Sequence, residues 1–326
     1  MTDRTPLIEV DNLWVRLNTS RGPADAVRGV SFSLTRGATL GLVGESGCGK
    51  TVTAMALMGL LPESATISGS IRLHGQELVG LAESEYGKLR GNRISMIFQE
   101  PMTALNPMHT VGRQVAEPLR RHKGFSAAQA RNEAIALLDR VGLPDAARRV
   151  DAYPHQFSGG QRQRVTIAMA LACDPDLLIA DEPTTALDVT VQAEIIELMR
   201  ALCAERGTAI LMISHDLGLV ANVCRRVAVM YAGRIVEERG SADIFRACAH
   251  PYTQGLVDSL PRLGSRAALG RTRLQEIAGV VPAISSFPDG CRFNPRCARA
   301  TGICRTTVPE TTLLGAGGLV RCHHHA

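Results

Sequence analysis

The chain has 326 residues, of which 45% are hydrophobic and 4% aromatic, and a formal net charge of +5. That length accommodates one large or two unequal domains around a mainly aliphatic core. A balance of 36 basic and 31 acidic residues gives no reason to expect a nucleic-acid partner. No apolar run reaches the roughly 20 residues of a membrane-spanning helix, and the N-terminus lacks the apolar stretch of a secretion signal. We therefore expect a cytoplasmic protein whose membrane role depends on its partners.

Hydrophobic periodicity predicts strands that alternate with helices, which is typical of a layered α/β fold with a mainly parallel sheet. The expected strands are residues 8–17, 27–34, 39–43, 71–73, 94–98, 177–180, 209–213 and 227–230, with the first two joined by a turn-rich stretch. The expected helices are residues 51–61, stopped by Pro62, and residues 127–141, 161–173 and 195–206. Near residue 260 the pattern gives way to a predicted linker, PRLGSRAALGRTR.

A phosphate-binding loop is predicted between the third strand and the first helix. Residues 44–51 read GESGCGKT and fit the pattern G-x-x-x-x-G-K-[ST]. Glycines in such a loop let successive backbone N–H groups point inward, and the following helix adds its positive N-terminal dipole. We expect Lys50 to reach the β- and γ-phosphates and the Thr51 hydroxyl to bind Mg²⁺.

Two adjacent acids follow the apolar strand 177–180. Asp181 and Glu182 would lie at the carboxyl end of a parallel strand, the edge where α/β sheets bind ligands. We expect Asp181 to hold Mg²⁺ through water and Glu182 to act as general base on the attacking water. The alternative is that both acids cap the next helix, which Pro183 and Thr184 would open.

Further motifs follow in a fixed order along the chain. Gln99 follows the strand 94–98, FSGGQR precedes a helix, Ala186-Leu187-Asp188 follows the acids, and His215 follows the strand 209–213. Each alone would pass as a strand end, a loop, a turn or a helix cap. Together with GESGCGKT and LLIADEP, the ordered set over residues 7–258 resembles the ABC ATPase family. The resemblance implies a RecA-like, mainly parallel sheet core, an antiparallel β subdomain and an α-helical signature subdomain.

The resemblance also implies a composite ATP site between two chains, in which the phosphate loop of one chain faces the signature loop of the other. The implied ATP-binding residues of this chain are Gly44, Ser46, Gly47, Cys48, Gly49, Lys50, Thr51, Gln99 and His215. The residues implied to face the ATP of a partner chain are Gln156, Ser158, Gly159, Gly160 and Gln161, with Asp188 in the loop between the two sites. The implied Mg²⁺ ligands are Thr51, Gln99 and Asp181, and the implied catalytic residues are Glu182, His215 and Gln99.

This sequence departs from the family pattern at the adenine end of the site. The family usually stacks adenine on an aromatic residue in the first strand region, where this chain has Leu17. Trp14 is nearby, but its spacing favours a place in the core. We therefore expect weaker stacking of the base, or an aliphatic contact in its place.

The C-terminal residues carry a second resemblance. HPYTQ at residues 250–254, FPDGCRFNPRCARATGICR and a closing RCHH resemble the extension of ATPases in oligopeptide and dipeptide importers. The expected domains are an ATPase domain over residues 1–258 and a small extension over residues 259–326. The implied function is ATP hydrolysis coupled to peptide import, with nickel complexes or glutathione as alternative cargoes.

Four of the nine cysteines lie in this extension with spacing C-x5-C-x6-C-x17-C, a pattern without the close pairs of most zinc sites. Some members of the resembling subgroup hold a four-iron four-sulfur cluster here, so the main expectation is a 4Fe-4S cluster. Zinc, reduced structural thiols and a ligand from His323–His325 are alternatives. The expected ligands are Cys291, Cys297, Cys304 and Cys322.

The implied partners are a second ABC ATPase chain, identical or homologous, two transmembrane permeases and an external substrate-binding protein. The implied location is the cytoplasmic face of the membrane. A rival hypothesis is a soluble ABC ATPase acting on ribosomes or DNA, although such proteins usually fuse two nucleotide domains or insert long coiled coils. A third is a redox or metal sensor with ATPase output, which depends on the cysteines alone.

Overall fold

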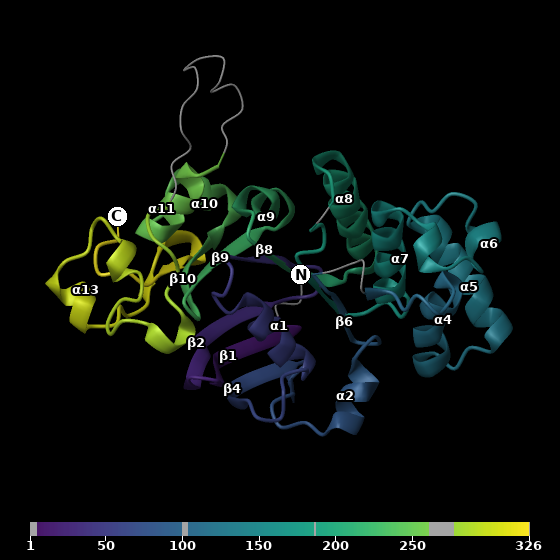
Figure 1. Cartoon of the computed structure of the whole chain (residues 1–326), viewed down its shortest axis with the longest axis horizontal. Coiled ribbons are helices and arrows are strands. Elements are labelled where there is room, and N and C mark those ends of the chain that lie inside the picture. The colour runs from purple at the N-terminus through teal and green to yellow at the C-terminus, as the bar shows by residue number, and fades with distance from the viewer. Residues whose placement is uncertain (1–4, 100–103, 186, 261–276, 326) are drawn as a thin grey trace, which may run out of the picture.

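The computed structural model describes residues 5–99, 104–185, 187–260 and 277–325. Two sheets form the framework of the molecule, with helices on both sides of the larger one (Figure 1). The linker predicted from residue 261 lies outside the described residues, as does Ala186 of the predicted loop before α8. Among the residues that are described, no helix is both long and apolar enough to cross a bilayer.

The smaller sheet is antiparallel and has the strand order β2-β1-β4-β5. Its strands are β1 (Ile8–Thr19), β2 (Gly22–Leu34), β4 (Thr66–Leu73) and β5 (Gln76–Glu77). The first two strands are longer than predicted, because Thr19 pairs with Gly22 and leaves only Ser20 and Arg21 for the turn. Their inward side chains form a buried apolar cluster with helix α1.

The larger sheet has the order β11-β12-β10-β9-β3-β8-β7-β6. Its strands are β3 (Thr39–Val43), β6 (Ile94–Ile97), β7 (Leu177–Asp181), β8 (Ala209–Ser214), β9 (Arg226–Tyr231), β10 (Arg234–Gly240), β11 (Thr312–Leu313) and β12 (Leu319–Val320). From β6 to β9 the pairing is parallel, and beyond β9 it is antiparallel. Every residue of β7 is buried, as expected for a parallel strand covered on both faces. The predicted mainly parallel core and antiparallel subdomain are thus confirmed.

Helices surround this sheet. They are α1 (Lys50–Met58), α2 (Glu83–Leu89), α4 (Val111–His122), α5 (Ala127–Arg140), α6 (Ala146–Arg149), α7 (Gly159–Leu171), α8 (Val189–Arg206), α9 (Leu217–Val223), α10 (Ser241–Arg246), α11 (Pro251–Asp258) and α13 (Gly302–Thr306), with the 3-10 turns η1 (Pro154–Gln156), η2 (Ile284–Ser286), η3 (Asn294–Arg296) and η4 (Gly315–Gly317). Helix α1 ends at Gly59 rather than at Pro62, because Gly59 takes the left-handed conformation, with φ of 60°. Helix α8 begins earlier than predicted, because the Asp188 side chain caps it by accepting from Val191 N–H.

The helices α4 to α7 gather at one end of the molecule and form the predicted helical subdomain (Figure 1). Helix α5 begins at a capping box, in which Ser126 accepts from Gln129 N–H and the Gln129 side chain accepts from Ser126 N–H. Its buried residues Ala130, Ala134, Leu137 and Leu138 are spaced for one helical face.

The C-terminal extension, residues 277–325, lies at the opposite end and joins the larger sheet (Figure 1). Strand β12 pairs with β10, with Val320 opposite Glu237 and Leu319 opposite Glu238. The Phe293 ring packs against Tyr231 and Tyr252, with ring centroids 5.2 and 5.4 Å away. The extension therefore shares both sheet and core with the ATPase domain, and a boundary at residue 258 stays a prediction.

Candidate nucleotide-binding and hydrolysis site

The loop of residues 44–51 runs from β3 into α1 and is shaped by its glycines. Gly47 and Gly49 have φ of 77° and 103°, values that L side chains rarely adopt. A Cβ on Gly44 would come within 2.2 Å of the Met230 carbonyl oxygen, and one on Gly49 within 2.6 Å of the Ala26 carbonyl oxygen. Only glycine fits at these two points, so neighbouring strands fix the path of the loop.

Lys50 is buried beneath the loop, with 5% of its surface exposed. Its ammonium group donates to the carbonyl oxygens of Gly44 at 2.7 Å and Glu45 at 3.0 Å. The Cys48 thiol lies 3.8 Å from the same nitrogen, and burial raises the pKa of Cys48, so this thiol stays neutral. The loop therefore holds a buried lysine at the head of α1, close enough to interact with the Asp181 carboxylate, and this positive charge suits an anionic ligand.

Asp181 ends strand β7 and is 2% exposed. Burial raises its pKa, the Thr51 hydroxyl hydrogen bond opposes that effect, and the Glu182 charge adds to it. Its Oδ1 atom is buried, and it has no hydrogen-bond partner among the residues that the structure describes. An orphaned carboxylate oxygen beside a hydroxyl is an oxygen donor set of the kind that Mg²⁺ takes, so the residues present fit the predicted ion.

Glu182 occupies a strained position and links two polar side chains. Its φ of 46° is in the left-handed region, which is uncommon for a residue with a side chain. One carboxylate oxygen accepts from Gln99 Nε2 at 3.2 Å, and the other lies 3.0 Å from His215 Nδ1. The carboxylate is 14% exposed. The strands β6, β7 and β8 thus bring together three residues that are far apart in sequence.

The phosphate loop, Gln99 and Glu182 line one cavity of about 430 Å³, and Asp181 and His215 adjoin it through Thr51 and Glu182. Its polar part consists of the phosphate loop from Ser46 to Thr51, Gln99 and Glu182. Leu17 of β1 and Ala26 of β2 line another part. The remaining wall comes from the C-terminal extension, at residues 281–284. This last contribution was not predicted.

The predicted signature residues do not line this cavity. Ser158 caps α7, where it accepts from Gln161 N–H, and the Gln161 side chain accepts from Ser158 N–H. Gly160 lies against α8, where a Cβ would come within 2.9 Å of Val191 Cγ1. Gln156 is exposed and its side chain accepts from Tyr153 N–H. The N-terminus of α7 is thus a second potential anion site, and its residues lie outside the cavity of the phosphate loop.

Two residues that sequence reasoning missed hold the phosphate loop from outside. Arg296 donates to both carboxylate oxygens of Glu45, at 2.7 and 3.0 Å. The Tyr252 hydroxyl accepts from Glu45 N–H at 2.9 Å. Both lie in segments that were singled out for family resemblance, but nothing in their local pattern indicates contact with residue 45.

The predicted iron–sulfur cluster is wrong. Among the described residues, no group of three or more His, Cys, Asp or Glu side chains is arranged to hold a metal ion. Cys291, Cys297, Cys304 and Cys322 are all free. Burial raises the pKa of Cys291 to about 11 and raises those of Cys297 and Cys322, which favours the neutral thiol at each position.

The alternative zinc site fails on the same finding. His324 Nε2 lies 2.7 Å from the Thr301 hydroxyl, and His323 Nε2 lies 2.9 Å from the Thr307 carbonyl oxygen. The Cys322 sulfur accepts from His324 N–H at 3.3 Å. His323, His324 and Cys322 are thus engaged in local hydrogen bonds, and the alternative of reduced structural thiols stays a prediction. The metal version of the sensor hypothesis loses its basis, and the redox version stays an untested hypothesis.

Comparisons with known proteins agree with this geometry. Residues 27–185 match the family model described as ABC transporter, and residues 236–304 match the one described as oligopeptide/dipeptide transporter, C-terminal region. A dimeric ATP-binding cassette in a post-hydrolysis state with ADP and Pi aligns at TM-score 0.64 and 28% identity, covering 72% of this chain and 98% of that one. The fold and site therefore define an ABC-type ATPase subunit.

Relatives that match nearly the whole chain identify the family within the class of ABC-type ATPase subunits. The oligopeptide transport ATP-binding protein OppD of Haemophilus influenzae is 50% identical, covering 97% of each chain. The OppD protein of Salmonella typhimurium is 51% identical over 93% of this chain and 89% of its own. The dipeptide transport ATP-binding protein DppD of Bacillus subtilis is 49% identical over 97% and 94%. This chain belongs to the oligopeptide/dipeptide transporter family of ABC ATP-binding proteins.

Proposed function

We propose that this chain is the ATP-hydrolysing motor of a membrane importer for dipeptides or oligopeptides. The observation that carries the proposal is the cavity that Lys50, Thr51, Gln99 and the bridged Glu182 line together, with the buried Asp181 carboxylate behind Thr51. The peptide cargo is supported by the names of the relatives, which are oligopeptide and dipeptide transport proteins over nearly the whole chain. Nickel complexes or glutathione, the other cargoes implied by the sequence, have no such support.

Thr51, Asp181 and Gln99 are the residues that would hold Mg²⁺ in this proposal. The ion would supply positive charge that neutralises the charge of the phosphate oxygens. Lys50 would exchange its bonds to the Gly44 and Glu45 carbonyl oxygens for phosphate oxygens. The remaining contacts of Gly44, Ser46, Gly47, Cys48 and Gly49 would be made by the backbone N–H groups of the loop.

Glu182 is the proposed general base. Its carboxylate would accept the proton of the attacking water, while the Gln99 amide and the His215 ring hold it in place from two sides. His215, whose side chain is 66% exposed, would also reach the γ-phosphate. The Thr185 hydroxyl also donates to this carboxylate, at 3.2 Å. Because Gln99, His215 and Thr185 already contact Glu182, the base is oriented before substrate arrives.

The dimer proposal follows from the position of the signature residues. A dimeric cassette is among the similar structures, which implies a partner ATPase for this subunit as well. We propose that Gln156, Ser158, Gly159, Gly160 and Gln161 face the nucleotide of that partner, because they lie outside the cavity of their own chain. Asp188, which caps α8, would lie at the seam between the two sites.

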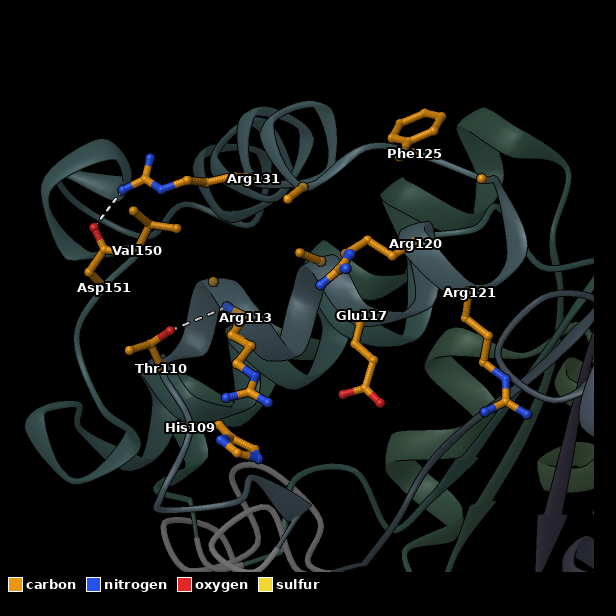
Figure 2. A pocket seen from close by; sticks show the side chains of 14 residues that line it. His109, Thr110, Arg113, Glu117, Arg120, Arg121, Phe125, Arg131, Val150 and Asp151 are labelled. Atoms are coloured by element: carbon orange, nitrogen blue, oxygen red, sulfur yellow. Dashed lines mark hydrogen bonds and ion pairs between the residues drawn. The ribbon is translucent and has the colours of Figure 1, made fainter.

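Membrane permeases are the second class of partner that this family implies. A groove of about 710 Å³ is lined by residues of α4, by the start of α5 and by Val150 and Asp151 (Figure 2). This groove is a suitable docking place. Arg113, Arg120 and Arg121 line it together with the apolar ring of Phe125. Glu117 and Asp151 supply the opposing charge, and Asp151 already pairs with Arg131. The surplus of positive charge fits an acidic, partly apolar cytoplasmic segment of a permease.

In this proposal the chain lies on the cytoplasmic face of the membrane, attached through the permeases. An external binding protein, together with the permeases, would then choose the cargo. The division into an ATPase domain over residues 1–258 and an extension over residues 259–326 is part of the same proposal, although the two share a sheet.

Reconstitution tests the proposed function. The chain is co-expressed with its genomic neighbours, purified in lipid nanodiscs, and assayed for ATP hydrolysis with and without peptide-loaded binding protein. We expect co-purifying permeases and peptide-stimulated hydrolysis. The double variant Arg113→Glu with Arg120→Glu reverses the charge of the groove. It should lose the stimulation of hydrolysis by peptide, whereas ATP hydrolysis by the free chain should be unchanged. A pool bound to ribosomes or DNA, with no permease, would contradict the proposal.

A further inference from the structure

The extension supplies part of the wall of the nucleotide cavity. Residues 281–284, Val-Pro-Ala-Ile, line it alongside Leu17 and Ala26. We call residues 281–284 the extension wall. The strand β2, which carries Ala26, packs against η2, which begins at Ile284. The wall therefore lies on the same side of the cavity as the position where the family pattern lacks its aromatic residue.

One guanidinium group fixes the extension wall relative to the phosphate loop. Arg296 donates to the carbonyl oxygens of Ala278 at 2.9 Å and Ile277 at 3.3 Å, just before the wall. The same group donates to the Glu45 carboxylate, and its side chain is only 4% exposed. After the wall, Ser286 N–H donates to the Ala283 carbonyl oxygen at 2.8 Å and closes a tight turn. The wall is thus held at both ends.

The cavity has two chemically different ends, which would hold different parts of a nucleotide. Lys50, Thr51 and Glu182 define an end for phosphates and metal. Leu17, Ala26 and the extension wall offer aliphatic surface alone, which favours the flat, weakly hydrated face of a base over charged groups. A nucleotide with its phosphates on Lys50 would therefore place its base between strand β1 and the extension.

We propose that the extension wall is a base-binding subsite, so that the C-terminal extension is a structural part of the nucleotide site. The inference rests on the proposed function of this cavity. Aliphatic side chains contact the face of a purine ring without reading its hydrogen-bonding edge, so the subsite takes adenine and guanine alike. It replaces the aromatic stacking that Leu17 cannot provide.

Binding of ATP is compared with binding of inorganic tripolyphosphate, which has the phosphates but no base, by calorimetry on the full chain. The test variant is Val281→Ala combined with Ile284→Ala. We expect its ATP and GTP affinities to fall by about three- to tenfold, the loss expected for a few buried methyl groups, with tripolyphosphate affinity unchanged. Val280→Ala is the matched control, because Val280 is adjacent and 85% exposed.

Equal ATP affinity in the double variant and the wild type would overturn the inference alone. If the wild type bound neither ATP nor tripolyphosphate, the proposed function itself would fail. Photolabelling of the wild type with 8-azido-ATP covers the case in which the double variant does not fold. The inference requires a base adduct within residues 277–290 that excess ATP prevents, and adducts confined to the strand β1 region would count against it.

Discussion

Arg296 and Glu45 form a two-point ion pair across 251 residues of sequence. The arginine belongs to the extension, and the glutamate is the second residue of the phosphate loop. The pair is partly buried, with the arginine side chain 4% and the glutamate side chain 32% exposed. The Tyr252 hydroxyl holds the backbone N–H of the same glutamate. The proposed phosphate-binding loop is therefore held in place by a residue of the C-terminal extension.

The first prediction concerns this brace. Arg296→Lys keeps the charge but cannot make two parallel bonds to the carboxylate or reach the carbonyl oxygens of Ile277 and Ala278. We expect the free energy of unfolding to fall by about 1–3 kcal/mol and ATP affinity to fall with it. Urea titration and calorimetry measure the two effects. Arg299→Lys, at an exposed neighbouring arginine, is the control, and equal losses in both variants would argue against a brace.

The second prediction concerns the general base. Glu182→Gln retains the shape that contacts Gln99 and His215 but cannot accept a proton from water. We expect ATP hydrolysis to fall by about 10²–10⁴-fold while ATP binding is kept, so that a dimer accumulates with ATP. Phosphate release and size-exclusion chromatography give the two measurements. Glu205→Gln removes an exposed partner of Arg140 and should leave both unchanged. Undiminished hydrolysis in Glu182→Gln would disprove the assignment.

The third prediction concerns the missing aromatic residue. Leu17 lines the cavity and is half-buried, so a tyrosine there has room to extend over a base. Stacking of a base on an aromatic ring contributes about 1–3 kcal/mol. We therefore expect Leu17→Tyr to raise ATP affinity by about fivefold or more, without a change for tripolyphosphate. Calorimetry measures both affinities. A general effect on the phosphate loop would change the affinities for ATP and for tripolyphosphate together.

The fourth prediction is a pH dependence of stability. His250 is fully buried, its Nδ1 accepts from Tyr252 N–H, and burial lowers its pKa to about 3. The unfolded chain takes up a proton below about pH 6.5 while the folded chain does not, so stability falls as pH falls. The loss is about 1.4 kcal/mol per pH unit, or about 2 kcal/mol between pH 6.5 and 5.

His250→Asn keeps a hydrogen-bond acceptor at this cap and removes the titration. The difference in unfolding free energy between wild type and variant should therefore shrink as pH falls from 6.5 to 5, measured by urea titration at each pH. His155→Asn, at an exposed histidine, is the control. A constant difference across this range would show that His250 does not titrate as its burial requires.

Local patterns in the sequence predicted much of the fold and of the hydrolytic site. The strand β3 matches its predicted residues, and α5 differs by one residue, because apolar spacing and the Ser126 capping box are local signals. The phosphate loop was predictable for the same reason, since its glycines and Lys50 are consecutive. The end of α1 was predicted wrongly, because Pro62 is the stronger breaker in general but Gly59 takes the left-handed turn first.

Features that depend on distant partners were not predictable. Strands β11 and β12 are two residues each and carry no periodicity, so only pairing with β10 defines them. Arg296 looks like any loop arginine until Glu45 is opposite it. The spacing of the four cysteines suggested a metal site, but spacing does not show whether the thiols converge or ionise.

The shared sheet of the two ends has a consequence for how the chain folds. Contacts such as Arg296 with Glu45 and Val320 with Glu237 join residues that are far apart in sequence. Forming them closes long loops of chain and costs conformational entropy, whereas a helix forms from local contacts without this cost. We expect the early folding nucleus to contain the phosphate loop, but neither the contact of Arg296 with that loop nor the extension wall. Competence to hold a nucleotide would then arise in the last folding step, and it would be lost first when the chain begins to unfold.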